Sequence, residues 1–248
     1  MRLKERVYTM AAFIAKQDYF GIADEATVVC ISSNDGKAAE VAEATNEIGE
    51  VVASNVYGVK LSPSNEYQLA RSLDINKGSF QLGGITTHGD VSICLGSMSI
   101  GTSAGSAPTI SASGEQVESG ASADCWFDIP AFRLEKCHHA QILFDAFTYN
   151  ATSDNIGTGV HLKSASYDVS CSITKGEKEG VCLTHDVTEG KIECSVEFIQ
   201  TGSTVPEITA GSGWVVTSPL ACSNPDADWP TWNATLTMYI PKSQHSEE

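Results

Sequence analysis

Residues 167–199 read YDVSCSITKGEKEGVCLTHDVTEGKIECSVEFI, and this stretch decides the fold class. Two runs in it, 167–173 and 192–198, alternate strictly between apolar and polar side chains. Successive side chains of a strand point to opposite faces, so this period of two predicts two half-buried antiparallel strands. The apolar positions are Tyr167, Val169, Cys171, Ile173, Ile192, Cys194, Val196 and Phe198, and the polar ones are Asp168, Ser170, Ser172, Glu193, Ser195 and Glu197.

The connection between the two runs, residues 174–190, is far longer than a tight hairpin turn. Connections of this length in a compact domain are usually functional or disordered, and three apolar residues at 181–183 indicate that this one packs against something. We therefore predict an extended hairpin that reaches beyond its own domain to a neighbouring subunit. The residues expected to make this contact are Lys175, Glu177, Lys178, Glu179, Val181, Cys182 and Leu183.

The composition limits the classes of protein that are possible. The chain has 248 residues, of which 42% are hydrophobic, which is ample for a core. Its formal net charge of −16 argues against a surface that grips nucleic acid, because phosphate neutralisation needs clustered cations. A soluble, self-repelling surface is the common explanation of such acidity, and a surface that must avoid sticking to DNA is the more specific one.

No targeting segment or membrane span is expected, because the apolar run at 10–15 is too short for either. The eight cysteines are dispersed along the chain, and without an export signal they favour reduced thiols over a disulfide framework. We expect residues 1–20 to form an N-terminal extension or arm. Residues 21–248 are expected to form a single β-rich domain, with a flexible loop in the stretch 101–123, which is rich in glycine and serine.

Short strands separated by turn residues predict a mainly β protein, an antiparallel sandwich or barrel-like fold with long hairpin arms. The expected strands are 27–32, 51–54, 56–61, 66–72, 79–82, 91–97, 159–163, 166–174, 191–200, 213–217 and 232–240. An apolar stripe predicts one flanking α-helix at 134–149. The alanine-rich stretch 36–47 is either a second, weaker helix or a loop arm.

Three local patterns resemble catalytic or metal-binding sites, but a structural role explains each of them better. Residues 101–105 match Gly-x-Ser-x-Gly, but no helical pattern follows to support a nucleophile elbow. Cys-His-His at 137–139 lacks a second Cys-x-x-Cys pair for zinc, and adjacent helical residues point in different directions. Asp226 and Asp228 lie in a proline-bounded turn without a complete set of calcium ligands. We therefore expect no enzyme activity, no cofactor and no metal.

The pattern resembles the major tail (tail tube) proteins of long-tailed bacteriophages, mainly over residues 125–240. The resemblance is carried by residues 164–171 leading into the charged connection, by the expected helix, and by the pair 213–216 and 232–240. What the resemblance implies is a β-sandwich or barrel-like subunit that forms rings, commonly hexameric. The rings stack into a tube, and a loop or hairpin of one ring docks on the next.

These expectations combine into a virion protein, assembled in the cytoplasm of a bacterial host, whose tube has an acidic lumen. Its partners would be copies of itself and other tail proteins, while DNA passes through the lumen without specific binding. A capsid decoration or neck protein would share nearly every feature. A surface carbohydrate-binding or adhesive module is the other alternative, with exposed tryptophans as sugar platforms. The tryptophans to consider are Trp126, Trp214, Trp229 and Trp232.

Overall fold

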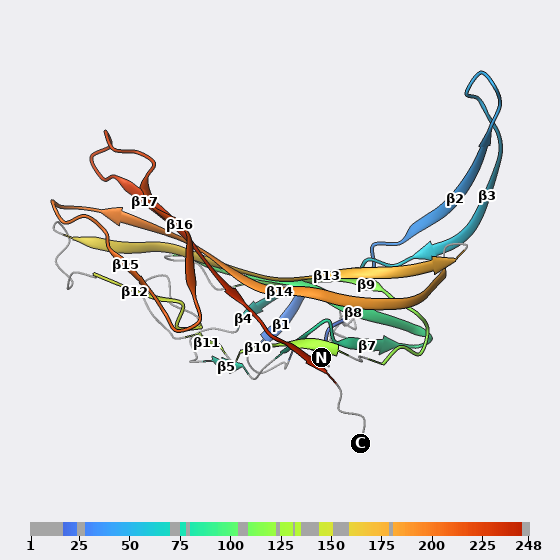
Figure 1. Cartoon of the computed structure of the whole chain (residues 1–248), viewed down its shortest axis with the longest axis horizontal. Coiled ribbons are helices and arrows are strands. Elements are labelled where there is room, and N and C mark those ends of the chain that lie inside the picture. The colour runs from blue at the N-terminus through green and yellow to red at the C-terminus, as the bar shows by residue number, and fades with distance from the viewer. Residues whose placement is uncertain are drawn as a thin grey trace, which may run out of the picture.

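A curved antiparallel sheet of nine strands forms the body of the protein (Figure 1). Its order is β1-β4-β9-β8-β13-β14-β17-β16, and β7 pairs with one end of β8. The bounds are β1 Val28–Asn34, β4 Ser64–Leu69, β9 Thr109–Gln116, β8 Val91–Ser103, β13 Val160–Lys178, β14 Val181–Gln200, β17 Thr231–Tyr239, β16 Val215–Cys222 and β7 Ile85–His88. The computed structural model describes residues 17–23, 28–69, 75–77, 80–103, 109–122, 125–130, 132–134, 144–150, 159–178 and 181–244.

The hairpin of β13 and β14 lies in the middle of this sheet and confirms the alternating pattern. Tyr167 pairs with Cys194 and Val169 pairs with Ile192 in the strand register. All four side chains are at most 1% exposed. The period of two therefore predicted correctly both the two strands and the face that each strand buries. The strands expected at 159–163 and 166–174 are one continuous strand, β13.

A bulge in β14 changes which side chains of this hairpin face the core. Glu189 and Gly190 together stand opposite the single residue between Ser170 and Ser172, and Glu189 has a φ of 59°. The extra residue moves Val187 onto the buried face, where it is 1% exposed. Gly190 itself leaves room for an aromatic ring, because an added Cβ would lie 2.3 Å from Phe127.

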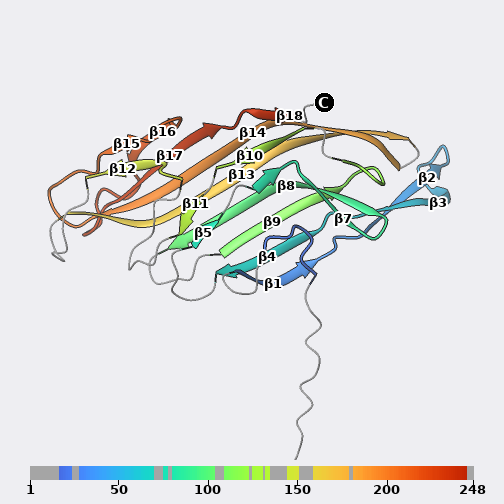
Figure 2. The same ribbon diagram turned by 90° about the horizontal axis from the view of Figure 1, so that it is seen from below.

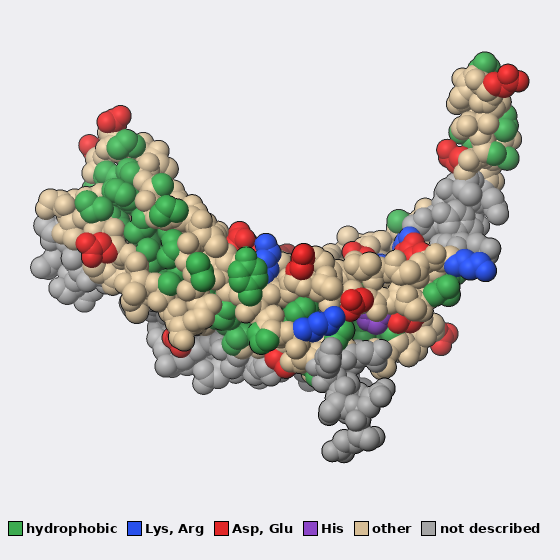
Figure 3. Space-filling view, viewed as in Figure 1, with side chains coloured by type: hydrophobic (Ala, Val, Ile, Leu, Met, Phe, Trp, Pro, Cys, Tyr) green, Lys and Arg blue, Asp and Glu red, His purple; other side chains and the backbone are tan. Residues whose placement is uncertain are grey.

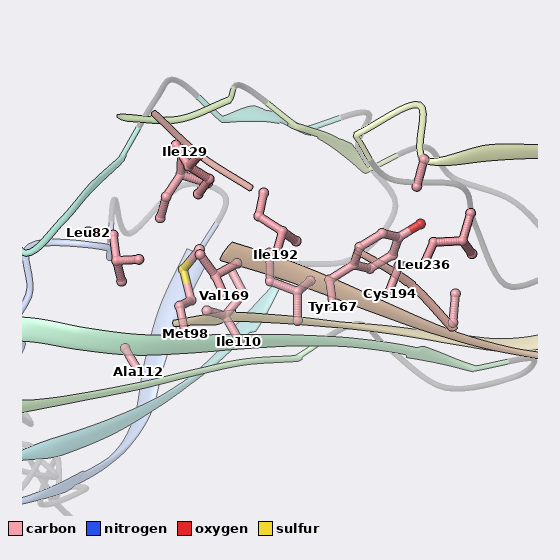
Figure 4. Packing of buried hydrophobic residues seen from close by; sticks show 14 of the residues in the cluster. Leu82, Met98, Ile110, Ala112, Ile129, Tyr167, Val169, Ile192, Cys194 and Leu236 are labelled. Carbon is pink, nitrogen blue, oxygen red and sulfur yellow. The ribbon is translucent and has the colours of Figure 1, made fainter. Parts of the chain in front are cut away.

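Short strands cover one face of the large sheet and close the core (Figures 2 and 4). They form three small antiparallel sheets: β18 (Lys242–Gln244), β10 (Cys125–Ile129) and β6 (Phe80–Leu82); β11 (Phe132–Leu134) and β5 (Ile75–Lys77); β12 (Phe147–Tyr149) and β15 (Ile208–Ala210). Leu82 and Ile129 from this layer face Met98 and Val169 of the sheet (Figure 4). Phe147 of β12 packs edge-on against Phe198, with ring centroids 6.1 Å apart. The covering layer thus supplies the apolar partners that the alternating strands require.

The flanking helix predicted at 134–149 is not supported by the described residues of that stretch. Leu134 ends β11 and residues 147–149 form β12, while residues 135–143 lie outside the described residues. Phe144 and Asp145 adopt positive φ angles of 56° and 47°, which turn the chain into β12. The part of the chain that the structure describes contains no helix, and so none that could cross a membrane.

The flexible loop expected at 101–123 contains regular strand instead. β8 continues to Ser103, and β9 pairs with both β4 and β8. Ile110 and Ala112 are at most 2% exposed, and Ser111 between them points the other way. Residues 104–108 lie outside the described residues. The small side chains of residues 109–116 therefore belong to a strand within the large sheet rather than to a loop.

The end of the expected N-terminal extension packs against the body. Residues 1–16 lie outside the described residues, but Tyr19 and Ile22 are buried. The carboxylate of Asp18 accepts a hydrogen bond of 2.5 Å from the Tyr67 hydroxyl, and burial followed by this bond raises the pKa of Tyr67. Residues 17–23 thus belong to the folded domain.

Candidate functional site

The second face of the large sheet is open and polar. No described element lies over it between the two raised ends of the molecule (Figure 1). A shallow hollow of about 520 Å³ on this face is lined by serines from several strands, together with Glu66 and Asp168. The serines that line it are Ser32, Ser64, Ser97, Ser99, Ser111, Ser113 and Ser170. The polar half of the alternating pattern therefore forms a continuous surface.

Carboxylates dominate the charges of this surface. Asp168 stands directly opposite Glu193 in the register of β13 and β14. Lys191 lies 3.6 Å from Glu193, and another lysine, Lys163, lies 2.9 Å from Glu197. Because each of these lysines contacts a carboxylate, they do not form a free cationic patch that would hold phosphates.

A second hairpin stands clear of the body (Figure 1). It consists of β2 (Ala38–Thr45) and β3 (Val51–Lys60), which we call the β2–β3 arm. The weak helix considered for 36–47 is therefore wrong, and the alternative of an arm is nearer to the structure. Asn46 closes the tip, since its side-chain oxygen accepts hydrogen bonds from the amides of Ile48 and Glu50. Pairing with β3 overrides the helix propensity of the alanines.

The β2–β3 arm is both apolar and acidic (Figure 3). Ile48 is 78% exposed, and the valines Val51, Val52 and Val59 are 52%, 62% and 56% exposed. Residues 38–59 contain four glutamates and neither lysine nor arginine. A two-stranded hairpin is at best marginally stable alone in water. The β2–β3 arm therefore exposes apolar side chains on a hairpin that stands clear of the body.

The root of the β2–β3 arm is fixed by close backbone contact. Gly36 has a φ of 56°, and an added Cβ would lie 2.2 Å from the Ser62 carbonyl oxygen. One ion pair then joins β3 to the tip of the β13–β14 hairpin, with Lys60 Nζ 2.8 Å from Glu177 Oε2. The hydrogen bond from Lys60 lowers the pKa of Glu177.

The connection expected to reach a neighbour is regular strand almost to its tip, and several of its side chains contact the same chain. Lys175 pairs with Glu115 at 2.5 Å, and the thiol of Cys182 donates to Glu118. Lys178, Val181 and Leu183 are exposed, the two apolar ones at 56% each, and Glu179 lies outside the described residues. Some of the predicted contact residues thus contact the same chain, and others are exposed to solvent.

Glu118, between β9 and β10, anchors this tip, and sequence reasoning missed it. Both of its carboxylate oxygens lie within 2.9 Å of His185 Nδ1. Burial raises the pKa of Glu118, but hydrogen bonds from its own backbone and from His185 outweigh this effect and lower it. No sequence signal joins residues 67 positions apart, so only the fold could bring them together.

The patterns considered for chemistry do not assemble into a site. Residues 101–103 of the Gly-x-Ser-x-Gly match end strand β8, and residues 137–139 lie outside the described residues. Among the described residues, no group of three metal-binding side chains comes together. The seven described cysteines are unpaired, and burial raises the pKa of Cys94, Cys171 and Cys194 to about 12.

Two of the four tryptophans belong to the packing of the sheet. Trp214 is 6% exposed and packs against Tyr167, with ring centroids 6.4 Å apart. Trp232 donates from its indole nitrogen to Gln200 at 2.9 Å. Trp229 is 65% exposed.

Comparison with models of protein families finds no match to this chain, and comparison with curated proteins finds none. The function must therefore be inferred from the open face, the arm and the strands themselves.

Proposed function

We propose that this protein is a structural virion protein that self-assembles into stacked rings and forms the tube of a phage tail. One observation carries the proposal: the large sheet buries one face in the core and leaves the other open, curved and lined by hydroxyl and carboxylate groups. Copies arranged in a ring with these faces inward would enclose an aqueous passage with acidic walls.

Such walls suit the movement of DNA. A cationic wall would hold each phosphate that it contacts, because binding releases condensed counterions. Carboxylates such as Asp168 and Glu193 repel phosphates instead and leave the polymer free to slide. DNA is therefore a passing cargo in this proposal, and the specific partners are further copies of the chain and other tail proteins.

The β2–β3 arm supports the stacking of one ring on the next. It projects from the body, and its exposed apolar side chains would be buried against a neighbour. We therefore assign the docking segment to this arm. The exposed pair Val181 and Leu183 on the other hairpin remains the alternative docking point.

A capsid decoration or neck protein would use the same edges and arms, and the shape of the assembly separates these roles. The carbohydrate-binding alternative is less well supported. Burial of Trp214 and the hydrogen bond of Trp232 favour packing roles for both, which leaves Trp229 as the most exposed candidate platform.

Electron microscopy of the purified protein over a range of concentrations tests the proposal. Hollow tubes or stacked rings are expected. A protein that stays monomeric at millimolar concentration, or that binds glycans as a monomer, would contradict it.

A matched pair of variants then identifies the docking hairpin. Ile48→Ser with Val52→Ser removes apolar surface from the β2–β3 arm, and Val181→Ser with Leu183→Ser removes it from the other hairpin. We expect the first variant to form single rings that do not stack, and the second to form tubes. The opposite outcome would return the docking role to the β13–β14 tip.

A further inference from the structure

The β2–β3 arm joins the body through two short links, residues 35–37 and 61–63, which belong to no strand. The second link is held to β9 from its first residue. The amide of Leu61 donates to Gln116 Oε1 at 3.1 Å, and the amide of Gln116 donates to the Leu61 carbonyl oxygen at 2.9 Å. These bonds fix where the arm leaves the body. Short links between paired strands can act as hinges, so the direction of the arm depends on contacts that the arm itself makes.

Lys60 provides such a contact. It is the last residue of β3 and therefore lies on the arm side of the second link. Its Nζ lies 2.8 Å from Oε2 of Glu177, at the tip of the β13–β14 hairpin, and about a third of each side chain is exposed. The ion pair thus joins the arm to a hairpin that belongs to the large sheet.

The tip of the β13–β14 hairpin is a firm point of attachment. Three further contacts hold it to the body: Lys175 with Glu115 at 2.5 Å, His185 with Glu118 at 2.8 Å, and Asp186 with Lys242 at 2.8 Å. The partners lie in β9, in the segment that follows β9, and in β18. The tip is therefore tied both to the large sheet and to the covering layer, and it can hold the arm in one direction.

We propose that the ion pair between Lys60 and Glu177 locks the direction of the β2–β3 arm and prepares the arm for docking. The lock is a property of the single chain, and its effect on stacking rests on the proposed function. An arm that is already held in the docking direction loses less conformational freedom on binding. Lys60 and Glu177 are thus positioning residues. Because exposed ion pairs contribute modestly, loss of this one should change the ratio of locked to unlocked arms about two- to fivefold.

Pulsed electron paramagnetic resonance on dilute, monomeric full-length protein tests the lock. Spin labels carried by noncanonical amino acids replace Glu47 at the arm tip and Thr87 of β7, both of which are exposed. We expect a narrow distribution of label distances for the wild type and a broad one for Glu177→Lys. The exchanged pair, Lys60→Glu with Glu177→Lys, should restore the narrow distribution. An unchanged distribution in Glu177→Lys, or no recovery in the exchanged pair, would overturn the lock.

A matched control uses another ion pair of the same hairpin. Lys242→Glu breaks a contact of equal length that does not involve the arm, and it should leave the label distances unchanged. An equal broadening in this control would show that any loosening of the tip releases the arm, and the assignment to Lys60 and Glu177 would fall. If circular dichroism shows that Glu177→Lys does not fold, Glu177→Gln and Lys60→Met carry the test, and each should broaden the distribution.

Assembly of the same variants without labels measures the consequence for stacking. Glu177→Lys should need about five- to tenfold more protein than the wild type to form tubes, and the exchanged pair should need the wild-type amount within about twofold, by sedimentation velocity and electron microscopy. Equal assembly of Glu177→Lys and wild type would overturn the role of the lock in docking. A wild type with a locked arm that never forms tubes would keep the lock and overturn the proposed function, whereas tubes built from subunits with unlocked arms would do the reverse.

Discussion

Gly190 controls how closely the covering layer approaches the large sheet, and replacing it by alanine tests this packing. Its φ lies outside the left-handed region, so the backbone accepts alanine and the change tests space alone. The new Cβ would lie 2.3, 2.4 and 2.8 Å from three carbon atoms of the Phe127 ring. Ordinary contacts begin near 3.5 Å, so the ring or the strand must move by roughly an ångström.

The expected cost follows from how firmly Phe127 is held. Its side chain is 3% exposed, and β10 pairs with β6 on one side and β18 on the other. The ring therefore cannot swing into solvent. Overpacking of a well-packed core costs about 1–3 kcal/mol, and we expect Gly190→Ala to reduce the free energy of unfolding by about 2–3 kcal/mol.

A double-mutant cycle makes the test specific. Phe127→Ala alone should reduce the free energy of unfolding by about 3–5 kcal/mol through loss of burial and cavity formation. In that background the space for the new methyl group is free, so Gly190→Ala should then cost less than about 0.5 kcal/mol. Urea unfolding of dilute monomer, followed by circular dichroism, measures all four proteins. An equal cost of Gly190→Ala in both backgrounds, or a cost below about 0.5 kcal/mol in the wild type, would refute the proposed approach of the layers.

Three further outcomes are expected. Phe198→Ala should reduce the free energy of unfolding by about 3–5 kcal/mol in urea titrations, because the ring is fully buried and packs on Phe147 and Tyr149; a loss below about 1 kcal/mol would contradict this packing. Glu118→Gln should reduce the free energy of unfolding by about 1 kcal/mol at pH 7. Because the pKa of Glu118 is lower in the folded state, the difference in this free energy between variant and wild type should shrink as the pH falls below about 4.5. A difference that grows in acid would contradict the direction of the pKa shift. Cys94 and Cys194 should resist a thiol reagent at pH 8 until the protein unfolds, because burial keeps their pKa at about 12; rapid labelling of native protein would exclude their burial.

The strands that follow a strict alternation could be predicted, and those made of small residues could not. Residues 109–116 read TISASGEQ, in which Ile110, Ala112 and Gly114 are the buried positions. The period of two is present, but alanine and glycine give little hydrophobic contrast, so the composition of the stretch favours a flexible loop. Close packing explains this composition, since an added Cβ at Gly114 would lie 2.3 Å from the Cys94 carbonyl oxygen.

Local propensity failed where strand pairing decided the conformation. The alanines of β2 favour a helix, but the valine-rich β3 that follows them offers a complete hydrogen-bonded ladder. The apolar stripe expected to form a helix at 134–149 ends in β12, whose Phe147 pairs with Ala210 of β15. The pairing of β12 with β15 joins residues far apart in the chain, and short-range periodicity carries no information about it.

By itself, the sequence determined the mainly β fold class and the central hairpin. An alternating pattern can be interpreted without knowledge of the fold, because successive side chains of any strand point to opposite faces. The 31 acidic residues, against 15 basic ones, set the charge of the surface. Only the tertiary structure decided which hairpin projects, which strands form the edges and which charges meet. Lys60 and Glu177 lie 117 residues apart, and their contact exists because the β2–β3 arm leaves the body beside the tip of the β13–β14 hairpin.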